Sequence, residues 1–412
     1  MRILVVSQYF WPEAFRVNDV VAELVRRGHE VTVLTGRPNY PGGEVFEDYR
    51  RNPAAFSHFE GAEVLRVPLR PRGQGSLRLM LNYLSFVLWG LFWGPWLLRG
   101  RGFDAIFMFQ TSPITAALPA LLLGRLKRAP VLMWVLDLWP DTLAAVGVVK
   151  SPRVLGWVGR LVAFIYRRCA RVLVQSKAFY SNVERWGGRR HDIRYFPAWA
   201  ESTFDQELDE AVLAPELEPY TEGFNVMFAG NIGEAQDFPA IVHAADLLRH
   251  RNDIRWLVLG DGRAAPWLRE EIARRGLADR VILLGRHPLE RMPSFFKGAG
   301  ALLVSLKPEP IFAMTIPGKV QSYLASGIPL VGMLDGEGAR VIMEAGAGRV
   351  APAGDAHALA EQVQALAGLP AEERRRMGQA GRAYCRREFD RNQLMSSLER
   401  WLAEAGTETR SR

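Results

Sequence analysis

Short runs of consecutive apolar residues alternate with amphipathic stretches along this chain, and the alternation predicts parallel strands separated by helices. The first run covers residues 3–7, and an amphipathic helix at about 17–27 and a second strand at 31–35 follow it. The pattern begins again halfway along the chain, where FNVMFAGNIG at 224–233 predicts a strand and a glycine turn. A chain that starts an α/β domain twice is expected to form two doubly wound sheets, which bind ligands beyond the carboxyl ends of their strands.

The remaining apolar runs extend both predicted sheets. Further strands are expected at residues 105–109, 131–136, 172–175, 256–259, 281–284, 301–304 and 329–331. Residues 195–220 are rich in proline and acidic side chains, which is typical of a linker. We therefore predict a first domain at 1–198 with an apolar helix at 77–99, a linker at 199–220, a second domain at 221–385, and a final helix at 386–412 that crosses back to the first domain. The predicted fold class is α/β, with two Rossmann-like doubly wound domains facing each other across a cleft.

The composition is that of a globular enzyme. The 412 residues exceed one ordinary core, and 49% hydrophobic with 23% charged residues argues against disorder. Cys169 and Cys385 are far apart and lack metal-type spacing, which indicates a reducing compartment and no structural disulfide. The first residues predict a strand and not a signal peptide, because the apolar run is short and no small-residue cleavage site follows. We expect a cytoplasmic protein.

The net charge of +8 is concentrated around one apolar segment. Residues 64–103 contain six arginines and no acidic residue, and the run inside them at 79–98 carries three tryptophans, two phenylalanines and a tyrosine. An aromatic-rich apolar helix with arginine flanks is typical of a segment lying in the interface of an anionic membrane. Gly90, Gly94 and Pro95 interrupt the run, which argues against a full span. The predicted membrane contacts are Arg78, Trp89, Phe92, Trp93, Trp96, Arg99 and Arg101.

Two alternative roles for residues 79–98 carry less weight. A helix packed inside the protein would have a similar composition, because apolar helices are most often core. Nucleic acid is not expected as a partner, because the aromatic residues adjoin aliphatic residues and are not interleaved with lysine.

The sequence TIPGKVQSYLASG at 315–327 carries the clearest phosphate-binding signal. Pro317 and Gly318 fit the start of a helix, and Gly327 fits its carboxyl-terminal cap. The positive end of the helix dipole and free backbone amides would then face a ligand. Lys319 in the first turn is unfavourable in an isolated helix, and a bound anion would explain it. The alternative is an ordinary surface lysine.

Glycine turns follow three strands of the second predicted sheet. They are GNIG with Gly230, Asn231 and Gly233, GDG with Gly260 and Gly262, and LLGRHP at 283–288. Glycine lets a backbone approach a diphosphate closely, although one such turn alone is a weak signal. Three turns at one sheet edge, together with the lysine helix, predict a nucleotide site. The P-loop motif does not occur in the chain.

Asp137 follows a predicted strand of the first domain, in the sequence DLWPD. A carboxylate at that position could orient or deprotonate an acceptor hydroxyl. Equally, it could cap a helix or hold a turn. The chain has no Asp-x-Asp sequence and its seven histidines show no metal-ligand spacing, so we expect neither a metal nor a cofactor.

These landmarks together resemble family 4 retaining glycosyltransferases of the GT-B type, whose architecture is two facing Rossmann-like domains. The resemblance is strongest to bacterial enzymes of O-antigen and exopolysaccharide assembly, such as the L-fucosamine transferase group. The matching stretches run in family order from residue 1 to about 354, and they are SQYFWPEAFRVND, RRGHEVTVLTGRPNYPGG, LDLWPD, FAGNIGEAQDF, VLGDG, VILLGRHP and IPGKVQSYLASGIPLVG.

The resemblance implies that a sugar is transferred, with retention of its anomeric configuration, from a UDP-sugar to a saccharide linked to undecaprenyl diphosphate. It implies a peripheral enzyme on the cytoplasmic face of the inner membrane, with Lys319 and Asp137 as catalytic residues. Donor contacts would come from Gly230, Asn231, Gly233, Gln236, Gly260, Gly262, Arg286, Glu309, Pro317, Gly318, Lys319, Gln321 and Ser322. Acceptor contacts would come from Arg16, Asn18, Asn39, Asp137 and Trp139.

The chain departs from the family pattern at three places. Family members carry two glutamates eight residues apart around the lysine helix, and Met314 and Ser322 stand there instead. The usual lysine after the GN-type turn is replaced by Gln236. The double-glycine loop after the first strand is replaced by residues 15–18, so Arg16 and Asn18 are the candidates to act there.

Two other functions are compatible with this architecture, since a fold does not settle a function. A UDP-sugar 2-epimerase would need no membrane helix, so residues 79–98 argue against it. A non-catalytic sugar-nucleotide-binding scaffold at the membrane stays open, because the glutamate pair is missing.

Overall fold

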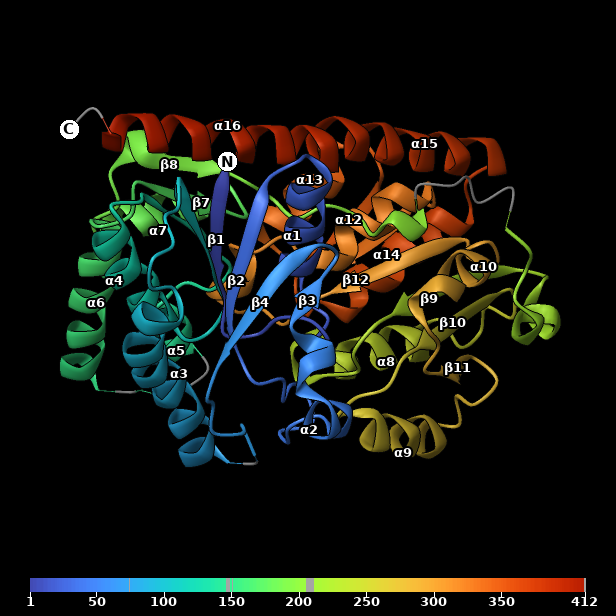
Figure 1. Ribbon diagram of the computed structural model, residues 1–412. Helices are drawn as coiled ribbons and strands as arrows, with labels where there is room; N and C mark the ends of the chain where they lie inside the picture. Colours follow the sequence, from blue (N-terminus) through green and yellow to red (C-terminus); the bar gives the residue numbers. More distant parts are fainter. Residues whose placement is uncertain (74, 146–148, 150, 205–210, 411–412) are drawn as a thin grey trace. The chain divides into compact units, whose positions relative to one another are not determined.

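The computed structural model describes every residue except 74, 146–148, 150, 205–210 and 411–412. The chain forms two compact α/β units, each with its own sheet (Figure 1). Unit 1 contains Met1–Pro197 together with Asn392–Arg412, and unit 2 contains Ala198–Arg391. The doubly wound α/β class predicted from the sequence is confirmed in both units.

Unit 1 has a sheet with the strand order β3-β4-β2-β1-β5-β6-β7-β8. The pairing of β3 with β4 is antiparallel, and the other pairings are parallel. The strands are β1 (Arg2–Val6), β2 (Glu30–Gly36), β3 (His58–Phe59), β4 (Ala62–Val67), β5 (Ala105–Gln110), β6 (Val131–Val135), β7 (Arg171–Val174) and β8 (Ile193–Tyr195). The strand order reverses between β1 and β5, and a sheet of this kind offers its ligand crevice at the carboxyl ends of the strands near that reversal.

The helices of unit 1 connect these strands and include the end of the chain. They are α1 (Arg16–Arg26), α2 (Glu47–Arg51), α3 (Ser76–Leu97), α4 (Ala117–Lys127), α5 (Asp141–Ala145), α6 (Pro152–Tyr166), α7 (Phe179–Arg185) and α16 (Arg391–Arg410). Ion pairs join α16 to the rest of unit 1, from Arg27 to Glu399 at 3.2 Å and from Arg171 to Glu408 at 2.5 Å. The final helix was expected to begin at residue 386, but it begins at Arg391, after α15 ends at Glu388. It packs in unit 1.

Unit 2 has a six-stranded parallel sheet with the order β11-β10-β9-β12-β13-β14. Its strands are β9 (Phe224–Ala229), β10 (Ile254–Leu259), β11 (Val281–Gly285), β12 (Ala301–Ser305), β13 (Leu330–Met333) and β14 (Gly348–Ala351). Its helices are α8 (Phe238–Leu247), α9 (Ala265–Arg275), α10 (Met292–Phe296), α11 (Pro310–Ala313), α12 (Gly318–Ser326), α13 (Gly336–Glu344), α14 (Ala356–Ala367) and α15 (Ala371–Glu388). The strand order reverses between β9 and β12.

Side chains on β9 alternate between two hydrophobic cores. Phe224, Val226 and Phe228 belong to one buried cluster, whereas Met227 belongs to another. Successive side chains of a strand point to opposite faces, so both faces of this sheet are covered. This double burial explains why the strands of the second half are continuous apolar runs in the sequence.

The described residues of the segment expected to be a linker, 199–204 and 211–220, pack as part of unit 2, whereas its residues 205–210 lie outside the described part of the chain. Trp199 and Leu217 are each 1% exposed, and Phe204 stacks on Phe296 with ring centres 5.5 Å apart. Proline and acidic content alone predicts a loop, but the apolar residues in the described part of this segment are buried in unit 2. The boundary between the two units accordingly lies at Pro197 and Ala198.

Candidate functional site

Lys319 lies where the strand order of unit 2 reverses. β9 ends at Ala229 and is followed by Gly230, and α12, which carries Lys319 in its first turn, begins at Gly318. A Cβ atom added to Gly230 would lie 3.4 Å from Nζ of Lys319. In doubly wound sheets the ligand crevice forms at this position, beyond the carboxyl ends of the strands. The structure thus brings the predicted lysine helix and the first glycine turn together.

The ammonium group of Lys319 is half-buried against a neutral environment. Nζ donates a hydrogen bond to Oε1 of Gln236 at 2.8 Å and lies 3.8 Å from the centre of the Phe228 ring. Within the part of the chain that the structure describes, no carboxylate forms an ion pair with it. Desolvation lowers the pKa of Lys319 to about 7, because burial disfavours the charged form. An anion bound beside Nζ would favour the charged form and raise the pKa again.

The three glycine turns of unit 2 pack directly on one another. Gly230 and Gly260 have φ angles of +145° and +138°, which few other residues adopt. The Gly260 amide donates to the Gly285 carbonyl at 2.7 Å, and a Cβ on Gly260 would lie 1.9 Å from the Gly230 carbonyl oxygen. A Cβ on Gly262 would lie 2.3 Å from the oxygen of Ile232. Glycine at 260 and 262 therefore permits the turns to stack, and the first turn keeps its position beside Lys319.

Helix α12 starts and ends where the sequence predicts. Pro317 precedes its first residue, and Gly327 caps it with a φ of +76°. Tyr323 attaches the helix to the end of β9, because its hydroxyl donates to the Ala229 carbonyl at 3.0 Å and accepts from the Ala229 amide at 2.9 Å. This attachment holds the first turn of α12 at the sheet edge.

Two predicted donor residues on α12 are bonded inside unit 2. Gln321 is 1% exposed, and its amide donates to the carbonyls of Pro317 and Gly318, each at 3.0 Å, in the orientation that satisfies its surroundings. Oγ of Ser322 donates to Oε2 of Glu201 at 2.5 Å. Glu201 was not among the predicted site residues. It lies in an acidic segment 121 residues before Ser322, and no local sequence pattern indicates a contact over that distance. A carboxylate therefore lies against one of the two positions where the family glutamates are missing.

The other predicted donor residues lie at the rim of the same sheet edge. Asn231 and Arg286 are exposed and follow β9 and β11, while Glu309 is exposed before α11. Gly233 precedes a short 3-10 helix that ends at Gln236. Among the described residues, no group of three or more His, Cys, Asp or Glu side chains is placed to hold a metal ion.

In unit 1, Asp137 lies beyond the carboxyl end of β6 and its carboxylate is fully bonded. Oδ2 accepts from the hydroxyl of Ser112 and from Nε1 of Trp139 at 3.2 Å, and Oδ1 accepts from the hydroxyl of Thr142 at 2.5 Å. These three donors favour the structural alternative, in which Asp137 holds the turn into α5. Trp139, a predicted acceptor contact, belongs to the same cluster.

Two predicted acceptor residues, Asn18 and Asn39, form hydrogen bonds with Glu13, a buried residue that was not among the predicted site residues. Glu13 is 2% exposed, and Oε1 accepts from the amides of Asn39 and Tyr40, each at 2.7 Å. Burial raises the pKa of the Glu13 carboxyl. Asn39 is completely buried, and the side-chain amide of Asn18 donates to the Glu13 carbonyl at 2.7 Å. Arg16 is bonded to Asp19 at 3.2 Å. Asn18 and Asn39 therefore hold these loops together.

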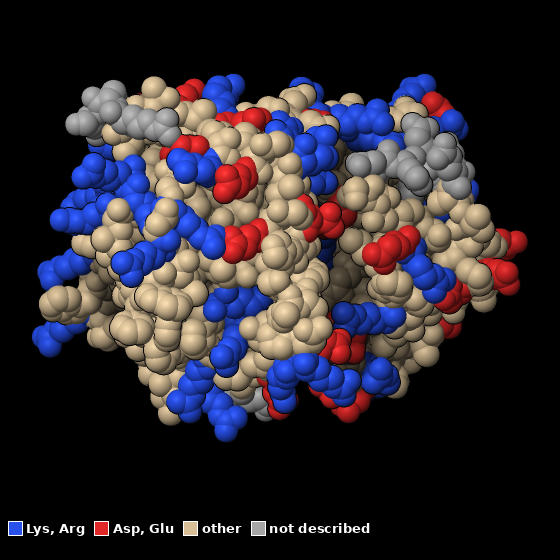
Figure 2. Space-filling view, in the orientation of Figure 1, with Lys and Arg blue, Asp and Glu red and all other residues tan. Residues whose placement is uncertain are grey.

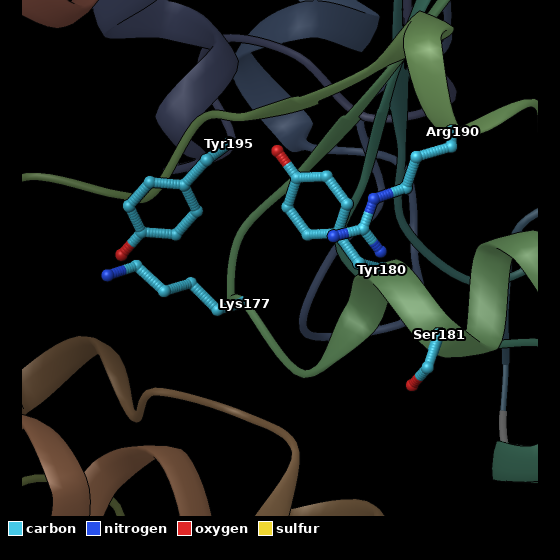
Figure 3. Close-up of a pocket in the computed structure, with 5 residues that line it drawn as sticks. All are labelled: Lys177, Tyr180, Ser181, Arg190 and Tyr195. Carbon is cyan, nitrogen blue, oxygen red and sulfur yellow. The ribbon is translucent and has the colours of Figure 1, made fainter.

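A pocket of about 370 Å³ is lined by residues that follow β7, lie on α7, and precede or end β8 (Figure 3). Lys177 follows β7, and its ammonium lies 5.8 Å from the centre of the Tyr195 ring. The guanidinium of Arg190 lies 4.9 Å from the centre of the Tyr180 ring and is bonded to Glu184 at 3.1 Å. The sequence did not mark these residues. A pocket of this size, with aromatic walls and cations, suits part of a polar ligand.

Helix α3, the predicted membrane segment, has two opposite faces. On one face Asn82 and Phe86 are fully buried, and a Cβ on Gly90 would lie 2.7 Å from Pro119 of α4. The other face exposes large apolar side chains at Leu77, Met80, Leu84, Leu88, Trp89, Phe92 and Trp96. The segment Leu77–Leu97 is long and apolar enough to cross a membrane by length and composition, with a mean hydropathy of 1.2 and 28% of it buried. Arg101 is paired with Glu63, which offsets its charge.

Known proteins match both halves of the chain. Residues 14–199 match the family model described as a glycosyl transferase 4-like domain, and residues 223–368 match the one described as glycosyl transferases group 1. A protein of Escherichia coli K12 named as a colanic acid biosynthesis glycosyl transferase, WcaI, is 26% identical over 341 residues, which cover 79% of this chain and 82% of that protein.

Solved structures match nearly the whole chain. Sucrose-phosphate synthase of Thermosynechococcus elongatus aligns with a TM-score of 0.72 at 16% identity and covers 97% of both chains. Anabaena HepE in complex with UDP-glucose aligns with a TM-score of 0.65 at 16% identity, over 98% of this chain and all of that one. At such identities the likeness establishes the fold, which is the two-domain GT-B fold.

Proposed function

We propose that the chain is a GT4-like glycosyltransferase with the GT-B fold, and that it transfers a sugar from a UDP-sugar to a saccharide linked to a polyprenyl diphosphate. Transfer would proceed with retention of anomeric configuration, in the assembly of a bacterial surface polysaccharide such as O-antigen, capsule or exopolysaccharide. An N-acetylated amino sugar is the donor sugar we favour, as in the L-fucosamine transferase group. The name of the Escherichia coli relative and the UDP-glucose bound to HepE support this proposal.

The observation that carries the proposal is the environment of Lys319. When the sugar leaves its donor, negative charge grows on the diphosphate, and a cation aimed at that position lowers the barrier. Lys319 is desolvated, lacks a carboxylate partner among the described residues, and stands at the strand reversal with Gly230 beside it. The first-turn amides of α12 add the positive end of a helix dipole. With this cation and these amides in place, we expect no metal to be required.

We further propose that Glu201 binds the ribose of the donor. The hydroxyl of Ser322 donates to Oε2 of Glu201, so this carboxylate lies against α12, the helix that carries Lys319 in its first turn. Charged hydrogen bonds to hydroxyls are strong, and a carboxylate is a common partner of ribose. Glu201 would then make the contact expected of the family glutamate whose position is taken by Ser322, although Glu201 does not lie on α12.

The acceptor would bind at the carboxyl edge of unit 1. There the turn held by Asp137 and the pocket with Lys177 and Tyr180 offer polar and aromatic contacts to a saccharide. The exposed apolar face of α3, flanked by Arg78 and Arg99, would hold the enzyme at the anionic cytoplasmic face of the inner membrane, where lipid-linked acceptors reside.

The decisive experiment is a panel of UDP-sugars tested with a saccharide on a short-chain polyprenyl diphosphate. We expect one UDP-sugar to be consumed and one sugar to be added, and nuclear magnetic resonance of the product should show the anomeric configuration of the donor. The same panel without acceptor tests for epimerisation of the UDP-sugar. Epimerised product, or tight UDP binding with no transfer from any donor, would contradict the proposal.

A further inference from the structure

A groove of about 740 Å³ lies on unit 1 where α3, α4 and α6 approach the sheet. Its apolar lining includes Leu91 of α3, Leu121 and Leu122 of α4, and Phe164 of α6. The three leucines are half-buried and Phe164 is 41% exposed, so the groove is open. Its volume lies in the range of about 300–1,000 Å³ that is usual for small-ligand sites.

Arginines surround this apolar groove. Arg125, Arg167 and Arg168 line it and are exposed. The guanidinium of Arg168 stacks on the Phe164 ring at 3.7 Å from its centre. Within the described residues, neither Arg125 nor Arg167 forms an ion pair with a carboxylate. An apolar floor with unpaired guanidiniums at its edge matches a molecule that joins hydrocarbon to an anionic phosphate.

The surface around the groove is apolar and basic. Trp157 and Val154 of α6 are 69% and 45% exposed, and Leu126 at the end of α4 is 54% exposed. Arg160 lies over the Trp157 ring, 5.0 Å from its centre. The sequences of α3, α4 and α6 contain no acidic residue, and Lys and Arg side chains gather over the α4 and α6 side of unit 1 (Figure 2). This surface matches an anionic membrane interface, and α6 extends it beyond α3.

The groove lies at the opposite edge of the sheet from the proposed acceptor contacts. Arg125 is near the end of α4, shortly before β6 begins at Val131, and Arg167 and Arg168 shortly precede the first residue of β7. These are the amino ends of the strands, whereas Asp137 lies beyond their carboxyl ends. The diphosphate of a polyprenyl-linked acceptor has to reach the carboxyl edge for transfer. We propose that the groove binds one anionic phospholipid of the membrane, with its chain on the leucines and its phosphate on Arg125 and Arg167.

Native mass spectrometry of the full chain tests this proposal. The probes are dihexanoyl phosphatidylglycerol and dihexanoyl phosphatidylcholine, each below its micelle concentration. We expect one phosphatidylglycerol to bind, roughly tenfold or more tightly than phosphatidylcholine. The double variant Arg125→Gln/Arg167→Gln should lose about tenfold or more of that affinity, since it removes two phosphate-binding charges. The matched control, Arg269→Gln/Arg274→Gln on α9 of unit 2, changes two exposed arginines away from the groove and should bind one phosphatidylglycerol like the wild type.

Equal binding of the two phospholipids, or unchanged affinity in the groove variant, would overturn the proposal. Displacement of phosphatidylglycerol by equimolar farnesyl diphosphate would also overturn it, because the groove would then take the polyprenyl chain. If circular dichroism shows the double variant unfolded, the single variant Arg167→Gln gives the same test. Sugar transfer to a short-chain soluble acceptor should be unchanged in the groove variant. A wild type that binds the phospholipid but transfers no sugar would refute the proposed function alone.

Discussion

The two sheets reverse their strand order in the same way, yet the polar groups at their carboxyl edges are satisfied differently. In unit 1, both oxygens of Asp137 accept hydrogen bonds from neighbouring side chains, and the buried carboxylate of Glu13 accepts from three backbone amides. In unit 2, Lys319 has a neutral amide and an aromatic ring as its partners. Burying a charge costs free energy unless another charge or several dipoles compensate it. The two sheet edges are similar in topology, and we propose that the uncompensated cation marks the edge that binds an anion.

The largest effect is expected from Lys319→Met. Methionine keeps the volume of the side chain and removes the charge, so turnover should fall by roughly 100-fold, as for the loss of one group that stabilises developing charge. Thermal stability should be equal to that of the wild type or higher, because a desolvated cation is removed. Steady-state kinetics and calorimetry on the same preparation measure both quantities.

Lys297→Met is the matched control for this variant. Lys297 is also in unit 2, and its ammonium donates to the backbone carbonyl of Ala211 at 2.6 Å, away from the strand reversal. Its turnover should equal that of the wild type. If the turnover of Lys319→Met equals that of the wild type, Lys319 takes no part in the mechanism. The unpaired cation would then not distinguish the edge of unit 2 from that of unit 1.

The pKa of Lys319 gives a second test of the same contrast. In the free protein the pKa is about 7, and a bound diphosphate raises it. Below pH 7 the lysine is already protonated, so UDP binding takes up no proton there. Above pH 7 binding should take up close to one proton, and UDP affinity should fall by up to about tenfold per pH unit. Titration calorimetry at pH 8 in buffers of different ionisation enthalpy counts the protons.

Lys319→Met provides the control for this titration. Its UDP binding should take up no proton in the window where the wild type does. Proton uptake that persists in the variant would assign the titration to another group, and its absence in the wild type would show that no anion approaches Nζ.

A smaller effect is expected from Glu201→Gln. If Glu201 accepts from the ribose, the wild type should bind UDP about tenfold more tightly than 2′-deoxy-UDP, and the variant should bind the two about equally. Glu218→Gln changes an exposed glutamate of the same segment and serves as the control. If Glu201→Gln still binds UDP more tightly than 2′-deoxy-UDP, another residue makes the ribose contact.

The elements of the fold could be predicted because they depend on local pattern. Buried parallel strands read as continuous apolar runs, and the start and cap of α12 follow from Pro317 and Gly327. The segment 199–220 was expected to be a linker because its composition is loop-like. Its burial in unit 2 depends on Trp199 and Leu217 meeting partners that are distant in the sequence.

The site was predictable only as far as its residue types were distinctive. A lysine in the first turn of a helix and a repeated glycine turn are local signals, so Lys319 and Gly230 could be named. The contact of Ser322 with Glu201 spans 121 residues, and the network around Glu13 joins the loops after β1 and β2 to α1, so neither follows from any sequence pattern. Asn39 shows the converse, because a polar loop residue looks exposed in the sequence and is completely buried in the structure.

The smallest effect on turnover is expected from Asp137→Asn. This variant tests the edge of unit 1, where both carboxylate oxygens already accept hydrogen bonds from neighbouring side chains. Asparagine keeps the shape of the side chain, but its NH₂ group cannot accept from Ser112, Trp139 or Thr142. One buried donor loses its partner, so the free energy of unfolding should fall by about 1–3 kcal/mol. Turnover should fall by less than about tenfold if, as we propose, the carboxylate orders a turn and takes no proton from the acceptor.

Urea unfolding and steady-state kinetics separate these two roles of Asp137. The exposed Asp48 offers a control, and Asp48→Asn should change the free energy of unfolding by less than about 0.5 kcal/mol. A loss of turnover near 100-fold in Asp137→Asn, with unchanged stability, would identify Asp137 as a general base. The carboxyl edge of each sheet would then contribute one reacting group, Asp137 in unit 1 and Lys319 in unit 2. In that case, a full set of internal hydrogen bonds would not mark a carboxylate of this fold as structural.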